Sequence, residues 1–145
     1  MADRVMEELD VNECLRLIGP GGIGRIACVG RFGPTVLPVN YKLRGGAIVF
    51  RTAENGPLDE DLRTGIADAD YQVAFEIDDI DLAAGRGWSV LVQGPAHHVQ
   101  GAELDVVRGT GVEPLAPGDR ELFVRIFPSR ITGRRVGPAP DPYQI

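Results

Sequence analysis

The sequence has few of the residues that build metal sites or disulfide frameworks. Its 145 residues include only two cysteines, Cys14 and Cys28, and two histidines, His97 and His98. Both cysteines have apolar neighbours, which predicts buried thiols rather than a disulfide. Adjacent residues of a strand point to opposite faces, so the two histidines are poorly placed to bind one metal ion. We therefore expect no metal site.

Positive charge and long apolar runs are also scarce. Lysine and arginine number 15 against 21 acidic residues, which gives a formal net charge of −6. This balance disfavours nucleic acid or an anionic membrane as the main partner. No apolar run approaches the roughly 18 residues of a membrane span. The segment Met1–Asp10 is too charged for a signal peptide, so we expect a cytoplasmic protein.

The motifs of the commoner enzyme classes are missing as well. There is no Walker loop and no Ser-His-Asp order with a supporting context. Gly19–Gly24 is rich in glycine, but it follows a predicted helix rather than a strand, which argues against a dinucleotide fingerprint. No catalytic acid or base can be named, and the substrate is therefore not predicted.

Short strands dominate what is present. Tyr71–Ile77 alternates apolar and polar residues, and Thr35–Leu43 and Ala47–Thr52 form a hairpin about the turn Gly45-Gly46. Trp88–Gln100 is the longest predicted strand, and its Gly94-Pro95 pair predicts a bulge or a sheet edge. An antiparallel barrel or sandwich in one domain is expected.

Helices are few and short. One is predicted from Asp10 to Gly19, with a capping box between Asp10 and Glu13. Two more are predicted after Pro57 and at Ala102–Arg108. The acidic residues that follow Tyr71–Ile77 are expected to form a solvated loop; they are Asp78, Asp79 and Asp81, with Glu76 just before them.

Three stretches, taken in order, resemble a known family. They are PVNYKLRGGAIVFRTA (38–53), GWSVLVQGPA (87–96) and PLAPGDRELFVRIFPSRITGRRV (114–136). Together they resemble the pyridoxamine 5′-phosphate oxidase-like proteins of the FMN-binding split-barrel superfamily, of the small actinobacterial type. The resemblance implies a mainly β fold: a six-stranded antiparallel split β-barrel of Greek-key type with two or three short helices. We expect this domain over residues 1–136 and a proline-rich tail at 137–145.

The resemblance also implies a homodimer with two cofactor sites at its interface. The cofactor is usually FMN, and relatives use the deazaflavin F420, FAD or haem. The cofactor-binding positions that correspond in this chain are Pro38, Val39, Asn40 and Tyr41 beneath the ring, Arg51 and Thr52 at the phosphate, and Trp88 and Ser89, which approach the cofactor from the same or the second subunit. Each of three residues also has a purely structural alternative to cofactor binding. These are an ion pair for Arg51, a backbone contact for Asn40, and a core or interface position for Trp88.

One position departs from the family pattern. Relatives commonly have a lysine after FRTA, where this chain has Pro57 among acidic residues. A lost cation weakens the attraction for a phosphate, and more so for the multiply charged F420 tail; Arg44 or Arg63 is a candidate replacement. The arginines Arg125, Arg130, Arg134 and Arg135 could take an acidic ligand or pair with the protein's own carboxylates.

Two classes of function therefore stay open. The first is an FMN-dependent oxidoreductase that acts on a small organic substrate. The alternative is a non-catalytic binding or storage protein for flavin, F420 or haem, or a split-barrel dimer that has lost its cofactor. Oxidation of pyridoxamine phosphate itself is disfavoured, since no cationic set for a phosphorylated substrate can be placed in the sequence.

Overall fold

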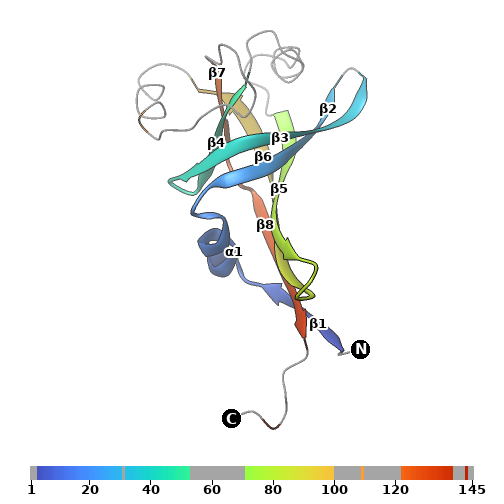
Figure 1. The fold of residues 1–145 in the computed structure, drawn as a ribbon. Helices are drawn as coiled ribbons and strands as arrows, with labels where there is room; N and C mark the ends of the chain where they lie inside the picture. The colour runs from blue at the N-terminus through green and yellow to red at the C-terminus, as the bar shows by residue number, and fades with distance from the viewer. Residues whose placement is uncertain are drawn as a thin grey trace.

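The computed structural model describes residues 3–30, 32–52, 71–99, 109, 122–138 and 143. Within these ranges the chain forms one helix and eight strands. They are β1 (Arg4–Leu9), α1 (Val11–Ile18), β2 (Gly22–Gly30), β3 (Gly33–Arg44), β4 (Ala47–Thr52), β5 (Tyr71–Asp81), β6 (Arg86–His98), β7 (Leu122–Ile126) and β8 (Arg130–Pro138). All eight strands belong to one sheet (Figure 1).

Six of the strands close into an antiparallel barrel. Their order is β5-β2-β3-β4-β7-β6, and the pairing of β6 with β5 completes the ring. The predicted six-stranded barrel is thereby confirmed. The other two strands form an extension: β8 pairs with β6, and β1 pairs with β8. In Figure 1 this extension leads away from the end where β4 and β7 lie.

Three aromatic side chains from three strands meet in the barrel core. The ring of Phe75 lies 5.4 Å from that of Tyr41 and 6.0 Å from that of Phe50, measured between centroids. All three are at most 1% exposed. A side chain at Gly24 would overlap the Phe75 ring, so the absence of a Cβ there makes room for this cluster. The alternation predicted for β5 thus points Phe75 inward.

The glycine turn of the predicted hairpin is confirmed. Gly45 and Gly46 have φ angles of 56° and 80°, a conformation that other residues rarely adopt. The turn fixes the register of β3 against β4 from Arg44 opposite Ala47 to Tyr41 opposite Phe50. Because of this register, the two strands separate beyond the pair Tyr41–Phe50.

Helix α1 covers one end of the barrel. Oδ1 of Asp10 accepts a hydrogen bond from the backbone N–H of Glu13 at 2.8 Å, so the predicted cap is present. The Glu13 carboxylate does not reach back as a full capping box requires; it binds two arginines instead. Cys14 and Ile18 on the inner face are fully buried. Cys14 and Cys28 are both buried and are not joined by a disulfide, as predicted.

The bulge or edge predicted at Gly94-Pro95 is present on one side of β6, where the three residues 127–129 stand opposite these two, between the pairs Gln93–Arg130 and Ala96–Ile126. The ladder between β5 and β6 runs without a bulge through Val73 opposite Gly94, and β6 is bonded on both sides. The change lies on its other side, where β6 exchanges β8 for β7 as its partner. The segment that joins β7 to β8 is hydrogen-bonded to β6 at this point. Phe127 N–H donates to the Pro95 carbonyl at 3.1 Å, and Ser129 N–H donates to the Gln93 carbonyl at 2.8 Å.

The acidic loop predicted after Ile77 is also corrected. β5 continues to Asp81, and Asp78, Asp79 and Asp81 pair with residues of β6. Strand β1 was not predicted, because its sequence RVMEEL has no clear alternation and its pairing with β8 spans most of the chain. β8 extends the sheet two residues beyond the predicted end of the barrel domain, to Pro138.

Several predictions fall outside the described residues. These are the two shorter helices after Pro57 and at Ala102–Arg108, and the acidic surroundings of Pro57 itself. Over the part of the chain that is described, no helix has the length and apolar character needed to cross a bilayer.

Candidate functional site

Strands β3 and β4 separate directly beyond the pair Tyr41–Phe50, where their ladder ends. On its other side β3 remains paired with β2 through Pro38 and Asn40. Among the described residues, no strand continues the ladder on the β4 side of Pro38–Asn40. β4 goes on to Arg51 and Thr52, where it pairs with β7. We call this point, formed by Pro38–Tyr41 and Phe50–Thr52, the β3–β4 fork.

Two of the predicted residues at the fork face the barrel core. Val39 is 9% exposed and Tyr41 is 1% exposed. The Tyr41 hydroxyl donates to the Ile18 carbonyl at 2.8 Å, and burial raises the pKa of this phenol to about 12. Pro38 and Asn40 lie on the opposite, outer face of β3. A molecule bound at the fork would therefore meet the backbone, not the side chains, of Val39 and Tyr41.

Arg51 lies against an aromatic ring. Its guanidinium carbon is 5.3 Å from the centroid of Phe123, which is its partner in the β4–β7 ladder. Phe123 in turn packs with Val49 and Val99 in a small buried cluster. A guanidinium fixed over a ring loses less freedom when it binds an anion, and it can hold two phosphate oxygens at once. The fork thus combines a strand edge with an oriented cation.

Trp88 and Ser89 lie on β6, which pairs with neither β3 nor β4. The β7 residues that pair with Arg51 and with His98 are Phe123 and Val124, so His98 marks the fork end of β6. Trp88 lies ten residues earlier in β6, where its partners are Asp79 on β5 and Arg135 on β8. The predicted site residues therefore form two groups within one chain.

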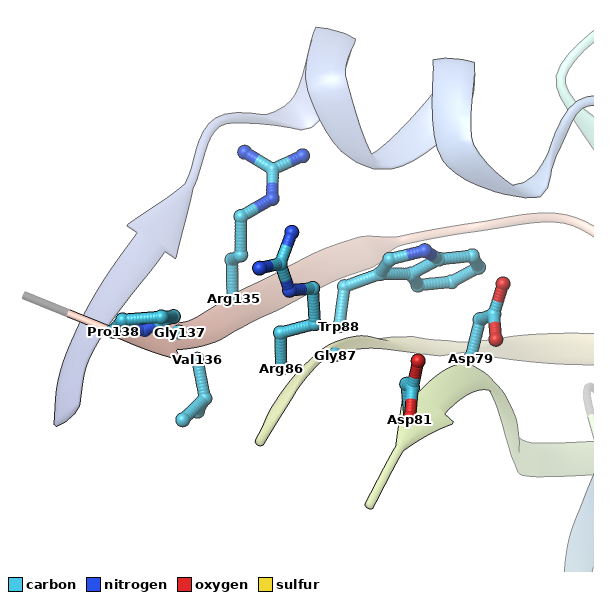
Figure 2. A pocket seen from close by; sticks show the side chains of 9 residues that line it. All are labelled: Asp79, Asp81, Arg86, Gly87, Trp88, Arg135, Val136, Gly137 and Pro138. Carbon is cyan, nitrogen blue, oxygen red and sulfur yellow. The ribbon is translucent and has the colours of Figure 1, made fainter. Parts of the chain in front are cut away.

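Trp88 lines a cavity of about 500 Å³ on the α1 side of the extension. Its strand partners are Asp79 on β5 and Arg135 on β8, and the next row pairs Asp81 with Arg86. Figure 2 shows these side chains on one face of the sheet, with the indole between acidic and basic groups. We call this cavity the indole pocket; it is lined by Asp79, Asp81, Arg86, Gly87, Trp88, Arg135, Val136, Gly137 and Pro138.

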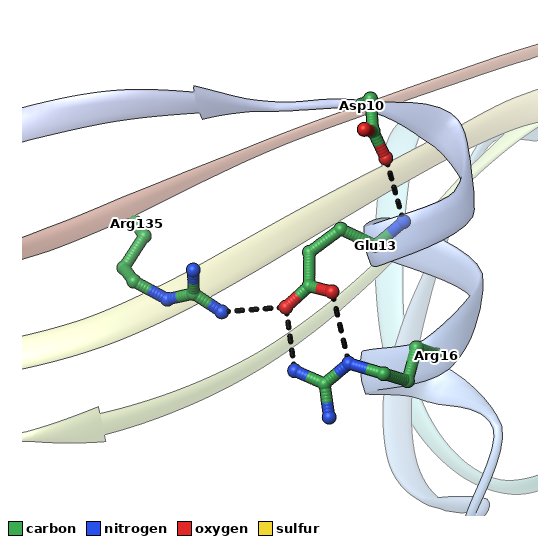
Figure 3. A network of polar contacts seen from close by, with 4 residues as sticks. All are labelled: Asp10, Glu13, Arg16 and Arg135. Atoms are coloured by element: carbon green, nitrogen blue, oxygen red, sulfur yellow. Dashed lines mark hydrogen bonds and ion pairs between the residues drawn. The ribbon is translucent and has the colours of Figure 1, made fainter.

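Arg135 is held in place by the first turns of α1 (Figure 3). Its Nη2 donates to Oε1 of Glu13 at 2.8 Å, and Nε of Arg16 donates to Oε2 of the same carboxylate at 2.9 Å. Hydrogen bonds from Arg16 and Arg135 lower the pKa of Glu13 to about 2. Sequence reasoning missed this contact, since the two residues stand 122 positions apart and no local spacing signals it.

A third group of charges lies on the outer face of the barrel. Nη1 of Arg25 contacts Oε1 of Glu76 at 3.2 Å and Oδ2 of Asp78 at 3.4 Å. Burial and the neighbouring Asp78 carboxylate raise the pKa of Glu76 to about 7, although Arg25 opposes the shift. Glu76 borders a cavity of about 660 Å³ to which Ser89 also contributes. Ser89 and Trp88 thus face opposite sides of β6.

The fork and Trp88 provide the types of chemical group that bind a flavin. A flavin needs hydrogen-bonding groups for its pyrimidine edge, a flat apolar surface for its ring and cations for its phosphate. The edge of β3 offers backbone groups, Trp88 offers a flat surface, and Arg51 offers a cation. Among the described residues, no three metal-ligating side chains gather into a cluster.

Comparisons with known proteins agree with this fold. The family model for pyridoxamine 5′-phosphate oxidase matches residues 10–135. The uncharacterized protein Rv0080 of Mycobacterium tuberculosis is 32% identical over 133 residues, which cover 92% of this chain and 87% of that protein.

Two solved structures are similar as well. The FAD binding protein from Mycobacterium smegmatis is 31% identical, with a TM-score of 0.69, and the match covers 88% of this chain and 96% of that one. A FAD-binding protein from Mesorhizobium loti has a TM-score of 0.74 at 17% identity, covering 93% and 99% of the two chains, a likeness of fold alone. With its six-stranded split barrel and a family model that spans most of its length, the chain belongs to the pyridoxamine 5′-phosphate oxidase family.

Proposed function

We propose that the protein is a homodimeric flavin-binding oxidoreductase of the cytoplasm that acts on a small organic molecule. FMN or a larger flavin would bind with its ring at the β3–β4 fork of one subunit and its phosphate at Arg51. The observation that supports this most directly is the fork itself: an edge of β3 without a neighbouring strand in the described set, beside a guanidinium oriented by Phe123.

The separation of the predicted site residues supports the homodimer. Trp88 lies on β6, which pairs with neither strand of the fork. A second copy, related by a two-fold axis, could place its Trp88 near the first chain's fork. Two-fold dimers are the commonest oligomers, and they produce two equal sites.

The chain's own part in such a reaction is binding and orientation. A bound flavin supplies hydride transfer, which no side chain of the fork could perform. The β3 backbone would hold the ring edge, and Arg51 would fix the phosphate. A ring held at its edge by β3 and at its phosphate by Arg51 would leave one face open to a small substrate.

The first experiment is to purify the protein, record its visible spectrum and titrate it with FMN and FAD. Micromolar uptake of a flavin whose bands bleach with NADH or NADPH supports the oxidoreductase. Uptake with no reduction by any physiological donor assigns the protein to the binding and storage class. A protein that takes up neither flavin would contradict the proposal. Light scattering in the same buffer tests the dimer.

Arg51→Ala tests the phosphate position. Loss of a charge-assisted hydrogen bond costs about 1.5–3 kcal/mol, or roughly 10- to 150-fold in the Kd for FMN. The control is Arg4→Ala on β1, a strand that pairs only with β8. Equal FMN affinity in the two variants would remove Arg51 from the site.

A further inference from the structure

A glycine in β6 leaves a hollow on the face of the sheet that is turned away from α1. Gly87 stands between Ile80 of β5 and Val136 of β8, which are its partners in the two ladders. A Cβ at Gly87 would lie 2.9 Å from the Cα of Ile80 and 3.1 Å from its Cγ1, so the missing side chain keeps this space open. Figure 2 shows Val136 pointing to the opposite face from Arg135 and Trp88.

The hollow has a volume of about 320 Å³ and mainly apolar walls. We call it the Gly87 hollow; the lining residues that decide its chemistry are Ile80, Leu82, Gly87, Ser89, Arg134 and Val136. Ile80 is 58% exposed and Leu82 is 87% exposed. Met6, which stands opposite Val136 on β1, continues the apolar row and is 61% exposed. Apolar side chains that gather at a cavity indicate a binding site, whereas single exposed ones do not.

One end of the Gly87 hollow carries a guanidinium. Arg134 stands opposite Ser89 on β6 and opposite Glu8 on β1. Its Nη1 contacts the sulfur of Met6 at 3.9 Å. Within the described ranges the ion pairs involve other arginines, although acidic residues outnumber basic ones by 21 to 15. The guanidinium of Arg134 therefore keeps its strongest donors for an external anion.

We propose that the Gly87 hollow binds a small monocarboxylic acid with an apolar body, such as a medium-chain fatty acid or an aromatic acid. The carboxylate would accept hydrogen bonds from the guanidinium of Arg134 and from the hydroxyl of Ser89. The apolar body would lie over Gly87, between Ile80 and Val136. This inference goes beyond the proposed function, because the hollow would take the acid whether or not a flavin is bound.

Hydrophobic contact and charge both favour such a ligand. An apolar body that covers the row from Ile80 to Met6 removes apolar surface from water, which favours binding roughly in proportion to the area covered. A guanidinium can hold a carboxylate through two parallel hydrogen bonds, which fixes the direction of the head group. The volume of about 320 Å³ lies at the lower end of the roughly 300–1,000 Å³ of small-molecule sites, so the acid must be small.

The charges near Arg134 limit the head group to one negative charge. Asp78 and Glu8 stand in the same row as Arg134 and Ser89, one at each end of it. A phosphate or a second carboxylate would be repelled by these two side chains, whereas a single carboxylate can lie between them. The other charged residues of the lining lie at the far end of the hollow, toward the turn between β5 and β6; they are Arg4, Asp81 and Arg86.

Isothermal titration calorimetry of the full chain without flavin tests the inference. The probes are decanoate and 1-naphthoate, each compared with its alcohol and its phosphate monoester. We expect at least one acid to bind at micromolar concentration, and its two analogues to bind at least tenfold more weakly. Arg134→Gln should weaken binding of the acid at least tenfold, since a charge-assisted pair is lost. Arg135→Gln, on the opposite face of the same strand, is the matched control and should change the Kd less than twofold.

Ile80→Asp is a second variant that leaves Arg134 intact. Because Ile80 is 58% exposed, the fold should tolerate the change, and the added carboxylate should repel the acid. We expect at least a tenfold loss of affinity. The control is Val5→Asp on β1, where Val5 is 47% exposed and alternates with Met6, so that it lies on the other face of the sheet.

The inference is wrong if neither acid binds, or if Arg135→Gln weakens binding as much as Arg134→Gln does. It is also wrong if the alcohol or the phosphate monoester binds as tightly as the acid. FMN is titrated into the same preparation as a separate measurement. Uptake of FMN without binding of either acid removes this inference and leaves the proposed function standing, whereas binding of an acid without uptake of any flavin does the reverse.

Discussion

The hydroxyl of Tyr41 donates a 2.8 Å hydrogen bond to the carbonyl oxygen of Ile18, which joins the middle of the barrel wall to the last turn of α1. Both residues are 1% exposed. The Ile18 carbonyl also accepts a bond from Gly21 N–H at 3.2 Å, so it keeps one partner when the phenol is lost. Tyr41→Phe should therefore cost about 1 kcal/mol of unfolding free energy, near the middle of the usual range.

Urea denaturation measures this loss, and Tyr143→Phe, at a position 90% exposed, is the control. Because Tyr41 faces the core, its variant should bind FMN as tightly as the natural protein does. A drop in FMN affinity without a change in stability would mean that the hydroxyl contacts the cofactor, contrary to its burial beneath α1.

Gly94 is the position least able to accept a side chain at the corner between β7 and β8. An added Cβ would overlap the Phe127 carbonyl oxygen and lie 3.0 Å from the Ser129 nitrogen. Both are backbone atoms, held by bonds to Pro95 and Gln93, so neither can move aside cheaply. Gly94→Ala should cost about 3 kcal/mol, at the upper end for overpacking. Gly137→Ala, whose nearest neighbour is 4.0 Å away, should cost far less by the same thermal melt.

Local patterns were sufficient for the barrel strands. The alternation of Tyr71–Ile77 and the turn at Gly45-Gly46 each express a constraint that neighbouring residues satisfy by themselves. β1 was not predicted because its side chains are mostly exposed, so its sequence shows no alternation of apolar and polar residues. Its hydrogen-bonded partner is β8, which lies far away in the sequence. The partner exchange at Gly94-Pro95 likewise depends on β7 and β8, which lie later in the chain.

The candidate site also has parts that the sequence could predict and parts that it could not. Arg51 and Asn40 could be named because the family resemblance includes the hairpin that carries both. The distance between Arg51 and Trp88 depends on how six strands close, and the contact of Glu13 with Arg135 depends on the extension. Neither relationship has a signal in residue spacing, so both required the structure.

Glu76 should make stability depend on pH near neutrality. Its pKa in the folded protein is about 7 against an ordinary value of 4.5, so the folded state binds more protons between these values and becomes less stable as pH rises from 4.5 to 7. Glu76→Gln removes this loss. Because the side chain is 36% exposed, solvent screening reduces the gain at pH 8 to about 1 kcal/mol, with little change at pH 5.

Urea unfolding at both pH values measures the effect, with Glu8→Gln on β1 as the control. Arg25 keeps its contact with Asp78 at 3.4 Å in the variant, so its charge stays paired. If Glu76→Gln proves less stable than the natural protein at pH 8, attraction to Arg25 outweighs burial and the pKa of Glu76 is lowered rather than raised.

Glu13 should act in the opposite direction, at lower pH. Hydrogen bonds from Arg16 and Arg135 depress its pKa to about 2 from an ordinary value of 4.5. Its contribution to stability is therefore complete above about pH 4.5 and is lost as pH falls through 2. Glu13→Gln should flatten the fall in melting temperature between pH 5 and pH 2, whereas Asp3→Asn at the exposed N-terminal end should leave it unchanged. A fall in melting temperature as steep in Glu13→Gln as in the natural protein would show that this carboxylate does not cause the acid sensitivity.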